Sequence, residues 1–336
     1  MKIGCAFLRY AYGHKARGDA MEAYGIYPVL REMGHESCVF WVDEYLNDKH
    51  AMHTKILEFA DREKPDILFF ILMKDEIPFK TLLALKERCV TVNWFGDDTW
   101  RFDHFTKVYA PYFTYAVTTD KYSLEKYRRC GYDHVILSQW ASWGYADTLV
   151  PEDISYEYDV SFAGMYSGHR EWIIKKLRKK GLRLGCFGHG WPDGIMPYDK
   201  LGDLFRKSRI NLNLSNSVSY DIRCLASGFK PLREFVGAKV KKGKKITQML
   251  KARNFEIPAF GGFQLTNYVP GLEDYFLPGR DVAVYATVED IMTQIHDYLK
   301  HEDKRRAVMM NGYKRAKEGH LYRDRFEQVL KEIQKR

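Results

Sequence analysis

Short apolar runs alternate with helix-like stretches through both halves of the chain, and this alternation restricts the possible folds more than any other feature. Apolar runs without interspersed polar residues are typical of strands buried on both faces, as in a parallel sheet. Strands that alternate with helices form βαβ units and doubly wound sheets, so the sequence predicts an α/β protein. The first half predicts strands at Lys2–Arg9, Cys38–Val42, Asp66–Met73, Val90–Phe95, Tyr115–Thr119 and His134–Leu137, and helices at Gly18–Met33, Met52–Glu63, Phe79–Arg88 and Ser123–Cys130.

The second half repeats this scheme after a segment of turn-forming and acidic residues between Gly144 and Tyr158. We therefore expect one Rossmann-like domain over residues 1–150, a second over 151–318, and a final helix in 319–336. No strand follows that helix, so it could pack anywhere, including back against the first domain. The second half predicts strands at Asp159–Ala163, Leu182–Phe187, Ile210–Leu214, Gly262–Thr266 and Val282–Tyr285, and helices at Arg170–Lys180, Tyr198–Lys207 and Thr247–Phe255.

Composition excludes several classes of protein. With 46% hydrophobic residues in 336, the chain has enough apolar side chains for two cores and is not intrinsically disordered. The longest apolar run, Ile67–Met73, is far shorter than the roughly 20 residues that cross a bilayer. The six cysteines are widely spaced and form no Cys-x-x-Cys pair, which favours buried thiols in a reducing compartment. We therefore expect a soluble, cytoplasmic protein without a transmembrane segment.

Positive charge is concentrated in the second half of the chain. Residues 151–336 hold 34 Lys+Arg and 23 Asp+Glu, a net of +11, against 19 and 21, a net of −2, in residues 1–150. A basic half next to a nearly neutral one points to an anionic ligand on the second half. A phosphorylated small molecule, a nucleic acid and an anionic membrane all fit, and so does a merely solvated lysine-rich surface.

Two loops of the first half carry candidate catalytic residues, because ligands of doubly wound sheets bind beyond the carboxyl ends of the strands. His14 lies in the loop after the first predicted strand, where it could act as a base or simply be an exposed loop histidine. Asp97 and Asp98 follow the strand Val90–Phe95 and could orient hydroxyls, accept a proton or hold a cation. Alternatively, Asp98 caps the following segment while Asp97 is solvated.

Three segments of the second half could bind an anion. Gly164, Tyr166 and Arg170 belong to a glycine-bearing turn between a strand and a helix, and a cation in a first helical turn favours a bound anion there. His189 lies in the loop Gly188–Trp191, which suits a flat heterocycle. Lys251, Arg253 and Glu256 precede the pair Gly261–Gly262; arginine can clamp a diphosphate and glutamate can accept ribose hydroxyls. The alternative for Arg253 and Glu256 is an ordinary surface ion pair.

These segments resemble the carboxyl-terminal domain of GT-B glycosyltransferases, in particular the CgeB-like, spore-maturation group. The resemblance covers about half of the chain, from Asp159 to Phe326, and rests on landmarks in a fixed order. They are Val160–Gly164 with Arg170, Phe187–Trp191, Ser208–Leu214, Arg253–Glu256 with Gly261, Tyr275–Gly279 with Val284 and Tyr285, and finally His320 and Arg325.

The resemblance implies a GT-B architecture, in which two Rossmann-like domains face a central cleft. It implies a nucleotide-sugar donor on the second domain, an acceptor on the first, no obligatory metal and no cofactor besides the donor. It further implies that Glu256 binds ribose and that Arg170 and Arg253 lie near the diphosphate. The candidate donor-binding residues are Gly164, Tyr166, Arg170, His189, Lys245, Lys251, Arg253, Glu256 and Gly261.

Two departures from the family pattern leave alternatives open. Many retaining GT-B enzymes have a second glutamate where this chain has Gln248, eight residues before Glu256. The stereochemical outcome is therefore open, and only inversion would need a base such as His14, Asp97 or Asp98. The stretch between Ser215 and Arg253 is longer than is usual for the family, and it contains the cluster Lys239–Lys245. This cluster could bind an anionic acceptor, including nucleic acid with a modified base. A non-catalytic, nucleotide-binding or coat protein of GT-B type is the other alternative.

Overall fold

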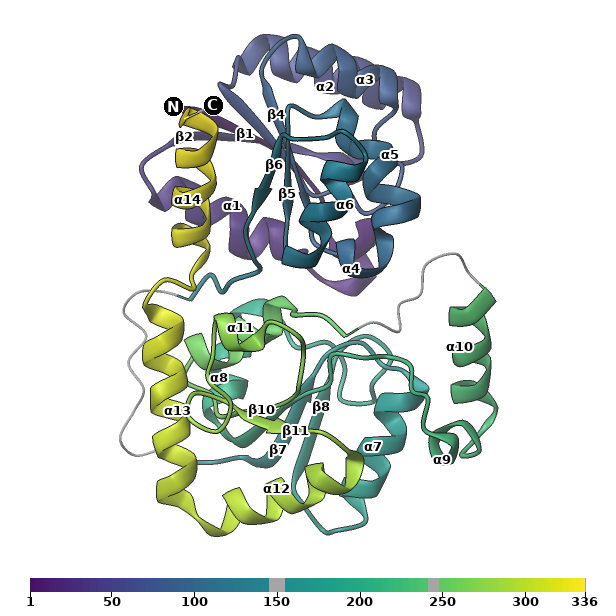
Figure 1. Ribbon diagram of the computed structural model, residues 1–336, viewed down its shortest axis with the longest axis vertical. Helices are drawn as coiled ribbons and strands as arrows, with labels where there is room; N and C mark the ends of the chain where they lie inside the picture. The colour runs from purple at the N-terminus through teal and green to yellow at the C-terminus, as the bar shows by residue number, and fades with distance from the viewer. Residues whose placement is uncertain (145–154, 241–247, 336) are drawn as a thin grey trace. The chain divides into compact units, whose positions relative to one another are not determined.

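The protein is described here from a computed structural model, which covers residues 1–144, 155–240 and 248–335 (Figure 1). The chain folds into two compact units, each with its own sheet and core. The first unit combines Met1–Trp140 with Tyr322–Arg336, and the second is Ala141–Leu321. The predicted boundary at residues 150 and 151 lies outside the described residues. Within the described ranges no helix is both long and apolar enough to cross a membrane.

The first unit contains a six-stranded sheet in the order β2-β1-β3-β4-β5-β6. Every neighbouring pair is parallel, with Ile3 opposite Ile67 and Ile67 opposite Val90 at the centre of the sheet. Strands β3 and β5 are buried at every position, as their uninterrupted apolar runs predict. The strands are β1 (Lys2–Phe7), β2 (Glu36–Trp41), β3 (Ile67–Phe70), β4 (Val90–Phe95), β5 (Tyr115–Thr118) and β6 (Val135–Leu137).

Helices connect these parallel strands. The predicted helix at Gly18–Met33 is a π-helical segment, Glu22–Ile26, followed by the short helix α1. Helix α2 begins before its predicted start because the Asp48 carboxylate accepts hydrogen bonds from the backbone of His50 and Ala51 at 3.0 and 2.9 Å. The helices are α1 (Tyr27–Glu32), α2 (Lys49–Glu63), α3 (Phe79–Lys86), α4 (Asp98–Arg101), α5 (Lys107–Tyr109) and α6 (Leu124–Arg129).

The second unit contains a five-stranded parallel sheet in the order β11-β10-β9-β7-β8. Its core joins apolar side chains of the strands to those of α7 and α12, among them Val160, Ile174 and Ile291. The strands are β7 (Tyr158–Ala163), β8 (Leu184–Phe187), β9 (Ser208–Asn213), β10 (Gln264–Asn267) and β11 (Ala283–Tyr285). The helices are α7 (Gly168–Arg178), α8 (Tyr198–Arg206), α9 (Ile222–Leu225), α10 (Phe229–Val240), α11 (Ala252–Ala259), α12 (Val288–Lys300) and α13 (Glu302–Lys317).

Helix α11 lies later in the sequence than the predicted helix Thr247–Phe255 and contains a proline. Pro258 has no N–H to donate to the carbonyl of Asn254, four residues earlier. The side chain of Gln264 on β10 supplies the missing donor, since its Nε2 lies 3.2 Å from that carbonyl oxygen. This tertiary hydrogen bond lets the helix continue through a residue that would otherwise end it.

The final helix, α14 (Tyr322–Lys335), belongs to the first unit although it follows the second in the chain. Phe326 packs edge-on against Phe69 of β3 and Trp94 of β4, with ring centroids 5.5 and 5.8 Å apart. The Tyr322 hydroxyl donates to the sulfur of Met21 at 3.2 Å. The carboxyl-terminal helix thus completes the cover of the first sheet.

Candidate functional site

The carboxyl ends of the five strands of the second sheet lie along one edge, because all five strands are parallel. Helices α7 and α12 follow strands β7 and β11, so they also begin at this edge. Helix α11 begins there too, since it leads back into β10. Helix N-termini carry partial positive charge and free N–H groups, which makes such an edge suitable for an anion.

Arg170 ties two of the loops at this edge together. Its Nη1 donates to the carbonyl of Met165 at 2.7 Å, and its Nη2 donates to that of Leu214 at 2.7 Å. The Nε donates to the carbonyl of Asn216 at 3.2 Å. The sequence attributes this cation to a bound anion, whereas in the structure backbone carbonyls account for its position. Arg170 therefore positions the loops after β7 and β9.

The loops after β7 and β8 lie side by side. The N–H of Gly164 donates to Phe187 at 2.8 Å, and the N–H of Tyr166 donates to His189 at 3.0 Å. Gly188 has a φ of +135°, and a Cβ there would lie 2.2 Å from the carbonyl oxygen of Gly164. Glycine thus permits the close approach that brings the predicted residues Gly164, Tyr166 and His189 together.

Tyr166 links this loop pair to helix α10. Its hydroxyl donates to the carboxylate of Glu171 at 2.5 Å, and the ammonium of Lys230 lies 3.8 Å from its ring centroid. Burial and the hydrogen bond to Glu171 raise the pKa of Tyr166 to about 12, so the phenol is neutral. Lys230, which the sequence did not single out, adds a cation beside the loop pair.

The start of α11 carries the predicted group Lys251, Arg253 and Glu256. Lys251 is the residue before the helix, and its N–H donates to the Asn254 side chain at 3.0 Å. Arg253 and Glu256 form an ion pair, with Nη1 and Oε2 2.7 Å apart. Gly261 follows the helix near the start of β10, at the opposite edge of the sheet from the helix start, and has a φ of +76°. Its place gives Gly261 a role in ending the helix rather than in binding at the loop edge.

The Arg253–Glu256 pair is electrostatically unusual because Glu256 is only 2% exposed. Burial raises the pKa of its carboxyl group, and Arg253 partly offsets this effect. The contact between the two groups is close but poorly aligned for hydrogen bonding, since Arg253 Nη1 has no hydrogen-bond acceptor among the described residues. A buried guanidinium donor of this kind can bind a ligand oxygen.

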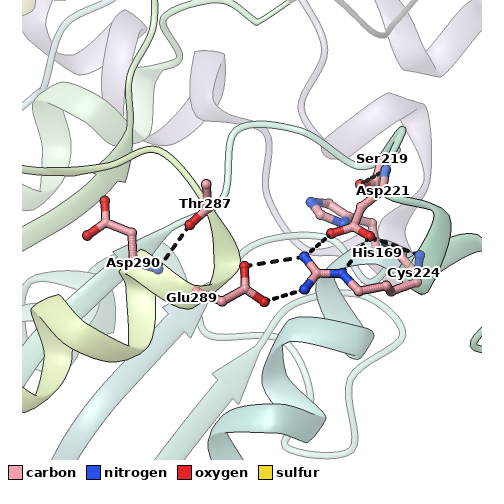
Figure 2. A network of polar contacts seen from close by, with 8 residues as sticks. His169, Ser219, Asp221, Cys224, Thr287, Glu289 and Asp290 are labelled. Atoms are coloured by element: carbon pink, nitrogen blue, oxygen red, sulfur yellow. Dashed lines mark hydrogen bonds and ion pairs between the residues drawn. The ribbon is translucent and has the colours of Figure 1, made fainter.

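A cavity of about 320 Å³ lies at the same edge, beyond β9, β10 and β11. The guanidinium of Arg223 spans one side, with Nη1 2.6 Å from Glu289 and Nη2 2.6 Å from Asp221 (Figure 2). His169 lines the cavity, and burial together with nearby Arg170 lowers its pKa to about 4, so the imidazole is neutral. Gln248 also lines it, the residue found where the family resemblance leads us to expect a second glutamate in retaining enzymes. The sequence missed Arg223 and Glu289, which lie 66 residues apart.

Asp98 in the first unit is a structural carboxylate. It is fully buried and accepts hydrogen bonds from Thr106 and Thr118 at 2.5 Å each and from Tyr127 at 2.8 Å. Burial raises its pKa to about 6 even though the three hydroxyl groups lower it. Because the group is enclosed by these donors, we drop it from the candidates for the base.

Asp97 and His14 are the two remaining predicted candidates for the base, and both lie at the carboxyl edge of the first sheet. Asp97 is half-buried at the start of α4, directly after β4, and its carbonyl accepts from Trp100 and Arg101. His14 is exposed between two short helical turns of the loop after β1. Loops that follow β1 and β4 emerge at the same edge because those strands are parallel to the intervening β3.

Glu22 is a further carboxyl group near this edge that the sequence did not reveal. It lies in the π-helical segment after the β1 loop and is 8% exposed. Burial raises its pKa to about 7, and the nearby carboxylates Glu76 and Asp43 contribute to the rise. A carboxyl group that titrates near neutral pH can act as a proton acceptor.

The remaining predicted donor residue, Lys245, lies outside the described residues, as does most of the cluster Lys239–Lys245. Helix α10 leads into this segment and ends at Val240.

Comparison with known proteins finds a family model that matches part of the chain and solved structures that share its fold. A family model described as glycosyl transferase-like matches residues 170–331. No curated protein matches the chain by sequence. Sucrose-phosphate synthase from Thermosynechococcus elongatus is similar over 99% of both chains, with a TM-score of 0.67 at 8% identity. HepE from Anabaena, in complex with UDP-glucose, is similar over 100% of both chains, with a TM-score of 0.60 at 11% identity. A glycosyltransferase from Rickettsia africae covers 98% of this chain and 97% of its own, with a TM-score of 0.61 at 9% identity.

These likenesses show the fold. The chain has the GT-B fold, with two Rossmann-like units, and its residues 170–331 are similar to the glycosyl transferase-like family. The finer resemblance to the CgeB-like group finds no counterpart in these matches.

Proposed function

We propose that the protein transfers a sugar from a nucleotide-diphosphate donor to a hydroxyl group or similar nucleophile of an acceptor. The observation that carries this proposal is the Arg253–Glu256 pair at the start of α11, in which the glutamate is buried. The pair lies within the segment that the glycosyl transferase-like family model matches. The family resemblance assigns the ribose to Glu256 and the diphosphate to Arg253. The CgeB-like group remains our proposed subfamily.

The donor chemistry requires stabilisation of a leaving diphosphate. As the acceptor oxygen bonds to the anomeric carbon, the bond from that carbon to the diphosphate breaks and negative charge develops on the leaving oxygen. Arg253, Lys251 and the N-termini of α7 and α11 would stabilise this charge without an obligatory metal. Arg170 acts indirectly here, because it holds the loops after β7 and β9 in place.

The acceptor side depends on the stereochemical outcome. In an inverting reaction the acceptor proton passes to a base, and Asp97, His14 and Glu22 near the carboxyl edge of the first sheet are the candidates. In a retaining reaction no such base is required. Gln248, which is neutral where the family resemblance leads us to expect glutamate, would then contact the sugar without a negative charge. Glu22 is the strongest base candidate on physical grounds because its pKa of about 7 suits proton transfer near neutrality.

Uridine diphosphate is the first nucleotide to test, since the structural neighbour HepE holds UDP and UDP-glucose. We expect saturable binding of a nucleoside diphosphate in a calorimetric titration. Glu256→Ala should weaken that binding at least about tenfold, because a charge-assisted pair of ribose hydrogen bonds is lost. Glu256→Gln should give a smaller loss, because the amide still accepts a hydrogen bond.

The matched control is Asp203→Ala, which removes the exposed ion pair between Asp203 and Arg206 in α8. It should leave nucleotide affinity unchanged. Failure of the uridine, guanosine, adenosine, cytidine and thymidine diphosphates alike to bind the wild-type protein would refute the proposal. Binding without hydrolysis or transfer of any sugar nucleotide would favour a non-catalytic nucleotide-binding protein.

A further inference from the structure

Helices α9 and α10 lie at one side of the second unit (Figure 1). They carry several exposed apolar side chains. Ile222 and Phe229 are each 77% exposed, and Leu232 and Val236 are 46% and 50% exposed. Residues 229, 232 and 236 are three and four positions apart, so they share one side of α10. We call Phe229, Leu232 and Val236 the outer apolar face.

The opposite side of α10 is the one that holds the helix in place. The Glu234 carboxylate accepts a hydrogen bond from the N–H of Gly168, at the start of α7, at 2.9 Å. The ring of Phe235 packs edge-on against Tyr220, with centroids 5.5 Å apart. Pro231 lies against Gly168 so closely that a Cβ there would come within 2.9 Å of its ring. Because these contacts fix α10, the outer apolar face is not needed to bury the helix.

The segment that contains α9 and α10 is strongly basic. Residues 216–250 contain eight Lys+Arg and two acidic residues. Both acids are engaged within the unit, Asp221 with Arg223 at 2.6 Å and Glu234 with the N–H of Gly168. Arg233 is exposed one residue from Leu232, on the side of α10 that carries the outer apolar face. Among the described residues, Lys230 and Arg233 are exposed cations of α10, so the charge that this helix presents to solvent is positive.

We propose that the outer apolar face docks on the surface of an anionic lipid bilayer. A helix with apolar side chains beside cations lies in the bilayer interface, where the side chains enter the acyl boundary and the cations meet lipid phosphates. A second copy of the chain would bring like charges together. Nucleic acid would satisfy the cations but would leave the apolar side chains exposed to water. Of these three occupants, the anionic bilayer is the one that satisfies both features.

This inference goes beyond the proposed function and does not depend on it, because lipid binding is measured without a donor or acceptor. The experiment is flotation of the full-length protein with vesicles of phosphatidylcholine alone and of phosphatidylcholine mixed with phosphatidylglycerol. We expect the protein to float with the anionic vesicles, to float less as salt is raised, and to bind the neutral vesicles weakly.

The decisive variant is the triple substitution Phe229→Ser, Leu232→Ser and Val236→Ser. Loss of three inserting side chains should weaken binding to anionic vesicles about 100-fold, while the melting temperature stays unchanged because these side chains are exposed. The matched control is Leu83→Ser with Leu277→Ser, two leucines elsewhere that are 48% and 44% exposed. This control should bind vesicles as the wild type does.

Any of three outcomes would overturn the inference. The first is that the wild-type protein fails to float with anionic vesicles, and the second is that the triple variant floats as well as the wild type. The third is that the control variant loses as much binding as the triple variant. If light scattering shows instead a dimer that the triple substitution dissociates, and vesicles bind neither form, the outer apolar face is an interface between copies.

Discussion

Two buried carboxyl groups of the first unit, Asp98 and Glu22, have raised pKa values for the same cause and yet differ in their surroundings. Burial is the largest cause for both. Asp98 receives three hydroxyl donors from separate elements, which fix it as a core group. Glu22 has the carboxylates Glu76 and Asp43 nearby. The first arrangement stabilises structure, whereas the second leaves a group ready to take up a proton.

Substitution of Asp98 separates its structural role from a catalytic one. Asp98→Ala leaves three buried hydroxyl groups without their acceptor and should lower the free energy of unfolding by about 3 kcal/mol, measured by urea denaturation. Asp98→Asn keeps an oxygen acceptor and should cost under about 1 kcal/mol at pH 7. If Asp98 were the base, Asp98→Asn would fold normally and lose transfer activity; we expect it to keep that activity.

The pH dependence of stability gives a second readout of Asp98. Its pKa is raised from 3.8 to about 6, so its favourable contribution is complete below pH 3.8 and is lost as pH rises through about 6. The difference in unfolding free energy between wild type and Asp98→Asn should therefore fall across this window, by at most about 1.4 kcal/mol per pH unit, and then level off. A difference that does not vary with pH would mean that Asp98 titrates normally.

The sequence predicts which loops carry Asp97, Asp98 and Arg170, but it does not predict what surrounds their side chains. Asp98 and Asp97 are neighbours after one strand, and only the fold shows that one of them is enclosed by hydroxyl groups from residues up to 29 positions away. Arg170 was expected to face an anion, but its Nη2 and Nε donate to carbonyls 44 and 46 positions away. Such partners come from tertiary contacts, which a single sequence does not display.

At the scale of the element, the strands were predictable because their apolar runs are buried on both faces. Strand Val90–Phe95 has the predicted bounds, and the other strands differ by a few residues at their ends. Helices α9 and α10 were missed, since their apolar residues include exposed ones and do not form a single buried stripe. The end of α11 was placed too early, because the helix continues through Pro258 with the help of the hydrogen bond from Gln264 to Asn254.

The pairing of the β7 and β8 loops depends on Gly188. Gly188→Ala would place a Cβ 2.2 Å from the carbonyl oxygen of Gly164, so the loops must separate. We expect a loss of about 3 kcal/mol in unfolding free energy and, if the proposed function holds, weaker nucleotide binding.

The matched control for Gly188 is Gly194→Ala. Gly194 also has a positive φ, of +76°, but a Cβ there would meet no atom within 4 Å. Gly194→Ala should therefore lower the unfolding free energy by about 1 kcal/mol, from backbone strain alone, in the same denaturation experiment. Equal losses for the two variants would show that the contact with Gly164 is unimportant.

At the scale of the whole molecule, the first unit is built from two separate parts of the chain, because α14 follows the second unit in the sequence but packs on the first. The pattern of two α/β halves predicted two Rossmann-like units, and the structural comparisons confirm that architecture. The sequence left the position of the last helix open, because an amphipathic helix fits many surfaces. The contacts of Phe326 with Phe69 and Trp94 place it on the first unit.

Phe326→Ala tests how much α14 contributes to the first unit. The side chain is 2% exposed, so its removal leaves a cavity and should cost about 3–5 kcal/mol. Hydrogen exchange should speed up in β3 and β4 and not in the second sheet. Glu327→Ala, an exposed position on the same helix, is the control and should cost under about 1 kcal/mol. A loss that small for Phe326→Ala would mean that α14 is only loosely attached.

The return of α14 to the first unit has a consequence for synthesis on the ribosome. The second unit is a continuous segment that ends at Leu321, so its last residue emerges before α14 does. The first unit is synthesised first, but the apolar surface around Phe69 and Trp94 stays uncovered until α14 emerges. The order of completion is thus the reverse of the order of translation, and the nascent first unit is the part of the chain that would need protection by a chaperone.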